Sequence, residues 1–326
     1  MSAAGAILAH DGPVKLLLPD SLPLAPALPG GVTAVTYAAA APVPDEHLDA
    51  EALVVWGSGT PELSAVAGRM PRLRWVQSLA AGPDAVLAAG FPGGVVVTSG
   101  AGLHDATVTE HALALVLALV RRLPAAARAQ AGHRWARELG GLQPLHPEGP
   151  VTTLLGARVL VWGFGAIAST LAPVLGALGA SVAGVARSAG ERAGFPVVAE
   201  ADLDGELART DVLVMLLPAT DATRHALDAG RLAALPAHAY VVNVGRGTTV
   251  DEEALVAALA AGRLAGAALD VTGTEPLPPE SALWEAPGLL LTPHAAGGRP
   301  VGADALIEAN LAALLAGEAL RNVVER

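Results

Sequence analysis

Short apolar runs alternate with Ala-rich stretches of helical periodicity along most of the chain. In the first third, the expected strands are 14–18, 32–37, 52–57, 73–79 and 95–99. The helices expected between these strands include 63–70 and 84–89. Strands that alternate with helices are typical of a parallel, doubly wound sheet.

A second alternating series begins at Arg158. Its expected strands are 158–163, 181–186, 211–217, 239–244, 266–271 and 289–293, and its expected helices are 166–179, 203–209, 251–261 and 303–316. The apolar face expected for the helix at 166–179 consists of Ile167, Leu171, Val174, Leu175 and Leu178. The repeated rhythm predicts a second parallel sheet.

A long apolar helix is expected at 107–124, between the two series, with Arg121 and Arg122 in its last turn. Residues 125–150 carry Gly, His, Pro and Trp135 with little periodicity, and we interpret them as an irregular arm that makes dimer contacts. The sequence therefore predicts two α/β domains.

The stretch from 159 to 186 has no charged residue, so a membrane span has to be considered. A span needs about 20 consecutive apolar residues. Here the run is interrupted at Gly163, Gly165, Pro173, Gly176, Gly179 and Gly184. We interpret it instead as a buried strand, a glycine turn, a helix and a second buried strand.

Composition narrows the function classes. The net charge of −11 argues against a nucleic-acid partner and against a polybasic membrane surface. The chain has no cysteine, its only lysine is Lys15, and its nine histidines show no paired metal-ligand spacing, so no metal is expected. The N-terminus lacks the features of a signal peptide, and we expect a cytoplasmic protein.

The segment GFGAIA at 163–168 fits the pattern G-x-G-x-x-G/A between an expected strand and an expected helix. Gly163 would permit the tight turn, and Gly165 would let the backbone approach a pyrophosphate. The N–H groups at the helix start, near Ala166 and Ile167, would bind the anion. A glycine-rich turn without a ligand is the alternative interpretation.

The end of the following strand bears on the choice of dinucleotide. The pattern expects an acidic residue there to bind the ribose 2′-hydroxyl. This chain instead has Arg187 and Ser188. A guanidinium would bind a 2′-phosphate that a carboxylate would repel, so NADP(H) is favoured over NAD(H). A solvated surface arginine remains the alternative.

Three further side chains follow expected strands of the second series. Arg246 lies between two glycines, Glu275 lies in a Pro-rich loop, and His294 follows a proline. Taken singly, each has an ordinary structural interpretation as a turn arginine, a solvated acid or a structural histidine. However, ligands of open α/β sheets bind at the carboxyl ends of the strands, where all three are expected.

In this set of motifs, the chain resembles the D-isomer-specific 2-hydroxyacid dehydrogenase family, in its glyoxylate/hydroxypyruvate reductase-like branch. The matching stretches are SLAAGPD (78–84), VTEHALALVLALVRRLP (108–124), VWGFGAIA (161–168), LLPAT (216–220), VVNVGRG (241–247), ALDVTGTEPLP (268–278), LW (283–284) and TPHAAG (292–297). The resemblance implies a Rossmann NAD(P)-binding domain at 101–294 and a smaller flavodoxin-like substrate domain formed by 1–100 with 295–326. It also implies a homodimer and hydride transfer between NAD(P)H and a small 2-oxo acid, or the reverse reaction on a D-2-hydroxy acid.

The resemblance also implies residue roles. Arg246 would hold the substrate carboxylate and its C2 oxygen, and His294 would be the acid/base with Glu275 as its hydrogen-bond partner. The backbone N–H groups of Ala81 and Gly82 would bind the carboxylate from the first domain. Cofactor contacts would come from Leu217, Pro218, Val244 and Asp270, in addition to Gly163, Gly165, Ala166, Ile167, Arg187 and Ser188.

The chain departs from the family pattern at Pro83 and Ala296, where the family usually has a β-branched residue and a glycine. Trp56, Leu79 and His104 are candidates for the substrate pocket, or for ordinary packing. A nucleotide-sensing, corepressor-like protein on the same fold is the alternative function. A formate or phosphite enzyme is a nearer rival, but the formate enzymes lack the Glu partner of the histidine.

Overall fold

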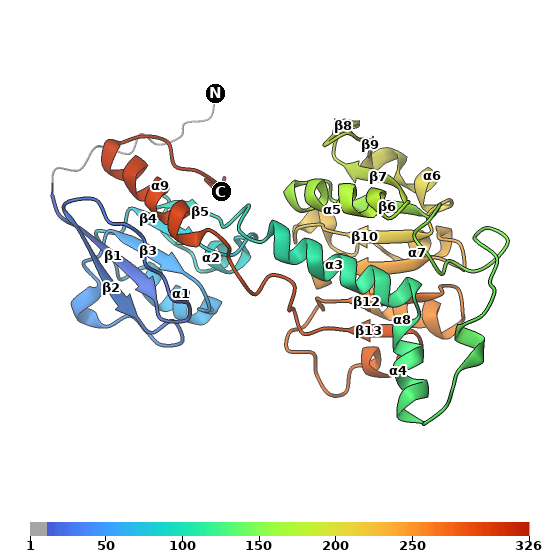
Figure 1. The fold of residues 1–326 in the computed structure, drawn as a ribbon. Helices are drawn as coiled ribbons and strands as arrows, with labels where there is room; N and C mark the ends of the chain where they lie inside the picture. Colours follow the sequence, from blue (N-terminus) through green and yellow to red (C-terminus); the bar gives the residue numbers. More distant parts are fainter. Residues whose placement is uncertain (1–11, 326) are drawn as a thin grey trace. The chain divides into compact units, whose positions relative to one another are not determined.

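Two separate sheets organise the chain, each in its own unit (Figure 1). The computed structural model describes residues 12–325, so the N-terminal stretch used to argue against a signal peptide lies largely outside the described residues. One unit comprises Met1–His104 with Arg299–Arg326, and the other comprises Asp105–Gly298. These boundaries lie four residues beyond those expected at 100 and 294.

The first unit contains a parallel five-stranded sheet in the order β2-β1-β3-β4-β5. Its strands are β1 Val14–Pro19, β2 Val32–Tyr37, β3 Ala52–Val55, β4 Trp75–Ser78 and β5 Val96–Thr98. Helices α1 (Thr60–Ala67) and α2 (Asp84–Ala88) pack on one face, and α9 (Ala303–Ala316) packs on the other. This order is that of flavodoxin-like folds.

The second unit contains an eight-stranded sheet in the order β13-β12-β11-β10-β6-β7-β9-β8. Its strands are β6 Arg158–Trp162, β7 Ser181–Ala186, β8 Gly190–Arg192, β9 Phe195–Ala199, β10 Val212–Met215, β11 Tyr240–Asn243, β12 Gly266–Leu269 and β13 Leu289–Leu291. The pairings are parallel except for the antiparallel pair of β8 and β9. The sequence analysis did not predict β8 and β9.

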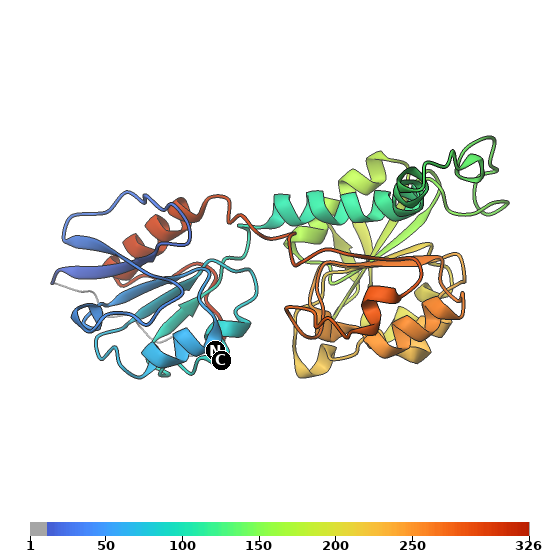
Figure 2. The ribbon, with the colours of Figure 1, turned by 90° about the horizontal axis from the view of Figure 1, so that it is seen from below.

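Helices cover both faces of the second sheet (Figure 2). On one face lie α3 (Asp105–Val120) and α5 (Ala166–Ala177), and on the other lie α6 (Leu203–Leu207), α7 (Ala229–Ala234) and α8 (Glu252–Ala260). Short 3-10 turns are η1 Asp45–His47, η2 Arg137–Leu139, η3 Glu200–Asp202, η4 Asp221–Thr223, η5 Gly247–Thr249 and η6 Ala282–Glu285. The predicted architecture of two doubly wound sheets is confirmed.

The long helix predicted at 107–124 ends earlier, at Val120. Arg122 adopts a left-handed backbone, and a new helix, α4 (Leu123–Ala131), begins with Pro124 in its first turn. Proline has no N–H to continue the preceding helix but suits the first turn of the next one. The arginine pair therefore lies beyond the end of α3, and the prediction of irregular structure from 125 is wrong up to Ala131.

The charge-free stretch forms β6, the turn, α5 and β7, as expected. The buried face of α5 consists of Ala168, Leu171, Ala172 and Leu175. Val174 and Leu178 are exposed, so the predicted apolar face was wrong in these two positions, which lie beside the buried stripe. Over residues 12–325, none of the helices combines the length and apolarity that crossing a bilayer requires.

Candidate active site

Seven strands of the second sheet run parallel, so their carboxyl ends share one edge. The site residues proposed for this unit lie at that edge, in the loops that follow it or, for Ala166 and Ile167, at the start of α5. The strands β6 and β10 are neighbours, although the chain passes through β7, β8 and β9 between them. Such a switch in strand order opens the crevice in which doubly wound folds bind ligands.

The turn after β6 has the geometry of a phosphate-binding turn. Gly163 has φ of 98°, and a Cβ there would lie 2.7 Å from the Leu216 carbonyl oxygen, so only glycine fits. Gly165 directly precedes α5, and a Cβ added there would meet no atom within 4 Å. The N-terminus of α5 is therefore open to a ligand at this glycine, which fits a pyrophosphate group.

Phe164, between these two glycines, turns into the core instead. It is buried, and its ring occupies the space above Gly184 in β7, where an added Cβ would lie 2.2 Å from the Phe164 Cδ2. The Phe164 ring therefore packs the turn against β7, in a space that is free because residue 184 has no side chain.

Arg187 and Ser188 follow β7 directly and are exposed. A second guanidinium joins them from β8. Arg192 donates from Nη1 to the Phe164 carbonyl oxygen at 2.9 Å, and its Nη2 lies 3.3 Å from the Ser188 Oγ. The sequence analysis missed Arg192, because the hairpin that returns it to the turn was not predicted.

The loop after β11 holds Arg246 between two crowded glycines. A Cβ at Gly245 would lie 2.7 Å from the Leu217 carbonyl oxygen, and a Cβ at Gly247 would lie 1.9 Å from the Thr272 carbonyl carbon. The loop thus fits closely between the ends of β10 and β12. Asn243 reinforces it, because its Nδ2 donates to the Arg246 carbonyl oxygen at 3.0 Å. Leu217 and Val244, two proposed cofactor contacts, are largely buried here, whereas Pro218 is exposed.

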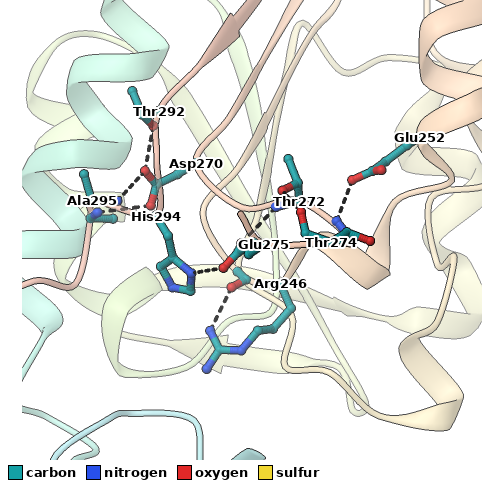
Figure 3. Close-up of polar contacts among 12 residues, drawn as sticks. Arg246, Glu252, Asp270, Thr272, Thr274, Glu275, Thr292, His294 and Ala295 are labelled. Atoms are coloured by element: carbon teal, nitrogen blue, oxygen red, sulfur yellow. Dashed lines mark hydrogen bonds and ion pairs between the residues drawn. The ribbon is translucent and has the colours of Figure 1, made fainter. Parts of the chain in front are cut away.

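His294 and Glu275 form a hydrogen-bonded pair, and Arg246 lies beside it (Figure 3). The His294 Nδ1 lies 2.7 Å from the Glu275 Oε2, and both side chains are partly exposed, at 47% and 36%. The Thr272 N–H donates to the other carboxylate oxygen at 3.0 Å. Glu252 of α8 supports the same loop by accepting the Gly273 N–H at 2.6 Å. The carboxylate is therefore aimed at one imidazole nitrogen.

Asp270 anchors the loop that carries His294 (Figure 3). It is almost fully buried, and its Oδ1 accepts the Thr292 hydroxyl at 2.6 Å and the Ala295 N–H at 2.8 Å. Its Oδ2 accepts the Ala296 N–H at 3.0 Å, and its backbone carbonyl accepts the His294 N–H at 2.7 Å. His294 has φ of 51°, a strained backbone for a residue with a side chain, which these bonds maintain.

His111 of α3 contributes to the same anchor. Its Nε2 lies 3.1 Å from the Asp270 Oδ1 and 3.0 Å from the Thr292 Oγ1. The sequence analysis proposed Asp270 for a cofactor contact but not as an anchor, and it did not propose His111. A buried carboxylate whose partners are distant N–H groups leaves no pattern in the sequence.

A cavity of about 750 Å³ opens beside the histidine. Its lining includes Asp270, Glu275, Leu277, Trp284, Leu291 and His294. The lining is mostly apolar around a few convergent polar groups, which is typical of small-molecule sites.

The remaining proposed site residues lie in the first unit. Ala81 is exposed and Gly82 half-buried, in the loop between β4 and α2. Gly82 and Trp56 line a cavity of about 340 Å³. Trp56 stacks on His104, whereas Leu79 is fully buried and belongs to the core. Leu79 is therefore a packing residue.

Residues 113–296 match the model of the D-isomer specific 2-hydroxyacid dehydrogenase family, NAD binding domain. The chain is 34% identical over 289 residues to a glyoxylate/hydroxypyruvate reductase A of Salmonella paratyphi B, a match that covers 85% of this chain and 86% of the relative.

Two solved structures share the whole fold. One is an NADPH-dependent glyoxylate/hydroxypyruvate reductase from Sinorhizobium meliloti in complex with NADP and sulfate, with a TM-score of 0.79, 28% identity and coverage of 96% of this chain and 98% of that one. The other is a D-isomer specific 2-hydroxyacid dehydrogenase from Xanthobacter autotrophicus in complex with NADPH and MES, with a TM-score of 0.75, 33% identity and coverage of 91% of both chains. The chain therefore belongs to the D-isomer-specific 2-hydroxyacid dehydrogenase family and is an NAD(P)-dependent enzyme of that family.

Proposed function

We propose that this enzyme reduces small 2-oxo acids of the glyoxylate and hydroxypyruvate type to D-2-hydroxy acids, with NADPH as the preferred reductant. The observation that carries the proposal is the His294–Glu275 pair, at 2.7 Å, beside Arg246 on the ligand-binding edge of a dinucleotide fold. The names of the relatives described above support the substrate class.

His294 is the proposed acid/base. Since its Nδ1 faces the Glu275 carboxylate, Nδ1–H is the hydrogen-bond donor and Nε2 is the nitrogen left for the substrate. In the reductive direction, the protonated Nε2 donates its proton to the oxygen at C2, while the bound nicotinamide supplies the hydride. Arg246 pairs with the substrate carboxylate and stabilises the charge that develops on the C2 oxygen.

The cofactor contacts are proposed along the same edge. The N–H groups around Gly163, Gly165, Ala166 and Ile167 bind the pyrophosphate. Leu217, Pro218, Val244 and Asp270 are the contacts proposed farther along the edge. A 2′-phosphate would be bound by Arg187 and Ser188, with Arg192 orienting the Ser188 hydroxyl.

The first unit, including residues 81 and 82, is the proposed substrate-binding domain, whose backbone N–H groups bind the substrate carboxylate.

The arm at 125–150 is the proposed dimer contact. It carries Trp135, which is 88% exposed, and Leu142 and Leu145, which are exposed as well. Large apolar side chains gathered on one short segment are typical of a surface that a partner covers. A homodimer would bury them.

A panel of 2-oxo acids, assayed with NADPH and with NADH, tests the function. Turnover of glyoxylate or hydroxypyruvate that is faster with NADPH is the expected result. Cofactor binding without turnover of any 2-oxo acid in the panel would instead indicate a nucleotide sensor. Turnover only with NADH would contradict the proposed role of Arg187.

A further inference from the structure

A second group of imidazole and carboxylate side chains lies at the opposite edge of the large sheet. Asp211 directly precedes β10, His238 precedes β11, and His146 comes from the arm. Their nitrogen and oxygen ligand atoms all lie within 4.8 Å of one another. Since β10 and β11 are parallel, this edge is the amino edge and lies away from the proposed catalytic residues.

Asp211 is buried in a way that leaves one oxygen for the two histidines. Its side chain is 5% exposed, and its Oδ2 accepts the Arg158 backbone N–H at 2.8 Å. Both imidazoles face the other oxygen. The His238 Nε2 lies 2.8 Å from the Asp211 Oδ1, and the His146 Nε2 lies 3.2 Å from it.

The orientation of His146 is set by its other nitrogen. The His146 Nδ1 lies 3.3 Å from the Gly149 carbonyl oxygen, which can only accept a hydrogen bond. A neutral imidazole that donates from Nδ1 presents a lone pair at Nε2. That lone pair then faces a carboxylate oxygen, an arrangement that a cation between them would stabilise. Histidine ligands of metals commonly donate their second ring N–H to a backbone carbonyl in this way.

The spacing suits a tetrahedral metal ion. Ligands at about 2.0–2.2 Å from zinc lie roughly 3.3–3.5 Å from one another. The His146 Nε2 lies near this distance from the Asp211 Oδ1, at 3.2 Å, whereas the His238 Nε2 is closer, at 2.8 Å, and would move outward to admit an ion. A cavity of about 350 Å³, lined by His146, Asp211 and His238, leaves room for water as a fourth ligand.

Two arginines also line this cavity and bear on its charge. Arg209 is paired with Glu206, with its Nε 3.0 Å from the Glu206 Oε2, and this pair raises the pKa of Arg209. Arg158 is exposed to solvent, where its charge is screened. Two nitrogen ligands and one carboxylate favour a borderline cation such as Zn²⁺ over Mg²⁺ or Ca²⁺.

We propose that His146, Asp211 and His238 form a binding site for Zn²⁺ or a similar divalent transition-metal ion. The ion would tie the arm to the amino edge of the sheet. The site escaped the search for paired spacings in the sequence because its residues come from three separate segments.

The test uses the full chain without a histidine tag, stripped with a chelator and titrated with Zn²⁺. We expect one bound Zn²⁺ per chain by calorimetry and elemental analysis, and visible absorption bands of a low-coordinate ion with Co²⁺. His146→Ala and His238→Ala should each weaken Zn²⁺ binding by about 100-fold or more. Removing a group that only hydrogen-bonds to a metal ligand lowers metal affinity by up to about 100-fold, and removing the ligand itself should cost at least as much.

His133→Ala is the matched control, since His133 is an exposed histidine at the start of the same segment. Zn²⁺ binding of the control should equal that of the wild type, and the melting temperatures in chelator should be similar for all variants. Any one of three results would overturn the proposal. These are no stoichiometric Zn²⁺ binding, Zn²⁺ binding that both histidine variants retain, and binding of inorganic phosphate in the cavity in place of Zn²⁺.

Discussion

The two edges of the large sheet carry the same kind of contact with opposite surroundings. At the carboxyl edge, the Glu275 carboxylate lies 2.7 Å from one imidazole, and both side chains are partly exposed beside a large cavity. At the amino edge, the Asp211 carboxylate lies 2.8 Å from His238 but is buried and shared with a second imidazole. The distance between carboxylate and imidazole therefore does not identify a catalytic pair.

The surroundings make the distinction. The Glu275–His294 pair leaves Nε2 of the imidazole directed away from the carboxylate, and the loop after β11 brings the Arg246 guanidinium to the same edge of the sheet (Figure 3). The amino-edge histidines instead direct Nε2 at the carboxylate itself. One arrangement can transfer a proton to a substrate, and the other can hold a cation or a loop.

The largest expected effect comes from replacing the imidazole at each edge. His294→Asn should lower kcat/KM for 2-oxo acid reduction by about 10²–10⁴, the usual contribution of acid/base catalysis. His238→Asn, assayed in parallel by NADPH oxidation, should leave kcat/KM within about twofold. Equal losses in the two variants would show that the comparison of the edges is wrong.

A smaller effect is expected from the carboxylate partner. Glu275→Gln keeps a hydrogen-bond acceptor toward His294 but removes the charge, and charge-assisted bonds contribute about 1.5–3 kcal/mol. We expect kcat to fall by roughly 10- to 100-fold with little change in the KM for the 2-oxo acid. Steady-state kinetics with Glu253→Gln, an exposed position of α8, as the control would check this. A change confined to KM would mean that Glu275 contacts the substrate.

The cofactor end of the carboxyl edge should show a selective effect. Arg187→Ala should raise the KM for NADPH by roughly 10-fold or more, since an arginine–phosphate bond is lost, and leave the KM for NADH nearly unchanged. Arg192→Ala should also raise the KM for NADPH, but by less, because this guanidinium contacts Ser188 and the turn. Parallel losses with both cofactors would contradict a 2′-phosphate site.

The smallest effect concerns stability at alkaline pH. Burial raises the pKa of Tyr37 to about 12 and also raises the pKa of Tyr240, which begins β11 near the amino edge. Each tyrosine ionises more readily when unfolded, so the free energy of unfolding should fall as the pH rises above about 10. Tyr37→Phe should flatten this decline between pH 10 and 12 in urea titrations. If the free energy of unfolding of Tyr37→Phe fell with pH as steeply as that of the wild type, ionisation of Tyr37 would not contribute to the loss of stability.

The sequence predicted most of the fold because buried parallel strands are near-continuous apolar runs. It missed β8 and β9, where Gly190, Gly194 and Pro196 interrupt a short and partly charged hairpin. It also missed α7, in which Leu232 is the single buried side chain. The break between α3 and α4 was predictable in principle from Pro124, but the helix was expected to end at that residue and not at Val120.

The candidate site divides in the same way. The turn at 163–168 and the loop of Arg246 could be predicted from their glycines and from their positions at strand ends. A side chain at Gly163, Gly245 or Gly247 would clash with the backbone, so the sequence shows glycine there. Asp270 as an anchor and Arg192 as a second guanidinium could not be predicted, since their partners are brought near only by the fold. The same reason hid the His146–Asp211–His238 group.

The pairing of Phe164 with Gly184 has a consequence for sequence change. The aromatic ring fills the space that a side chain at 184 would need, so the two positions share one fixed volume. A larger residue in β7 can be accepted only with a smaller one in the turn, and neither step is neutral alone. Redesign of the dinucleotide turn must therefore change residue 184 together with the residues of the turn.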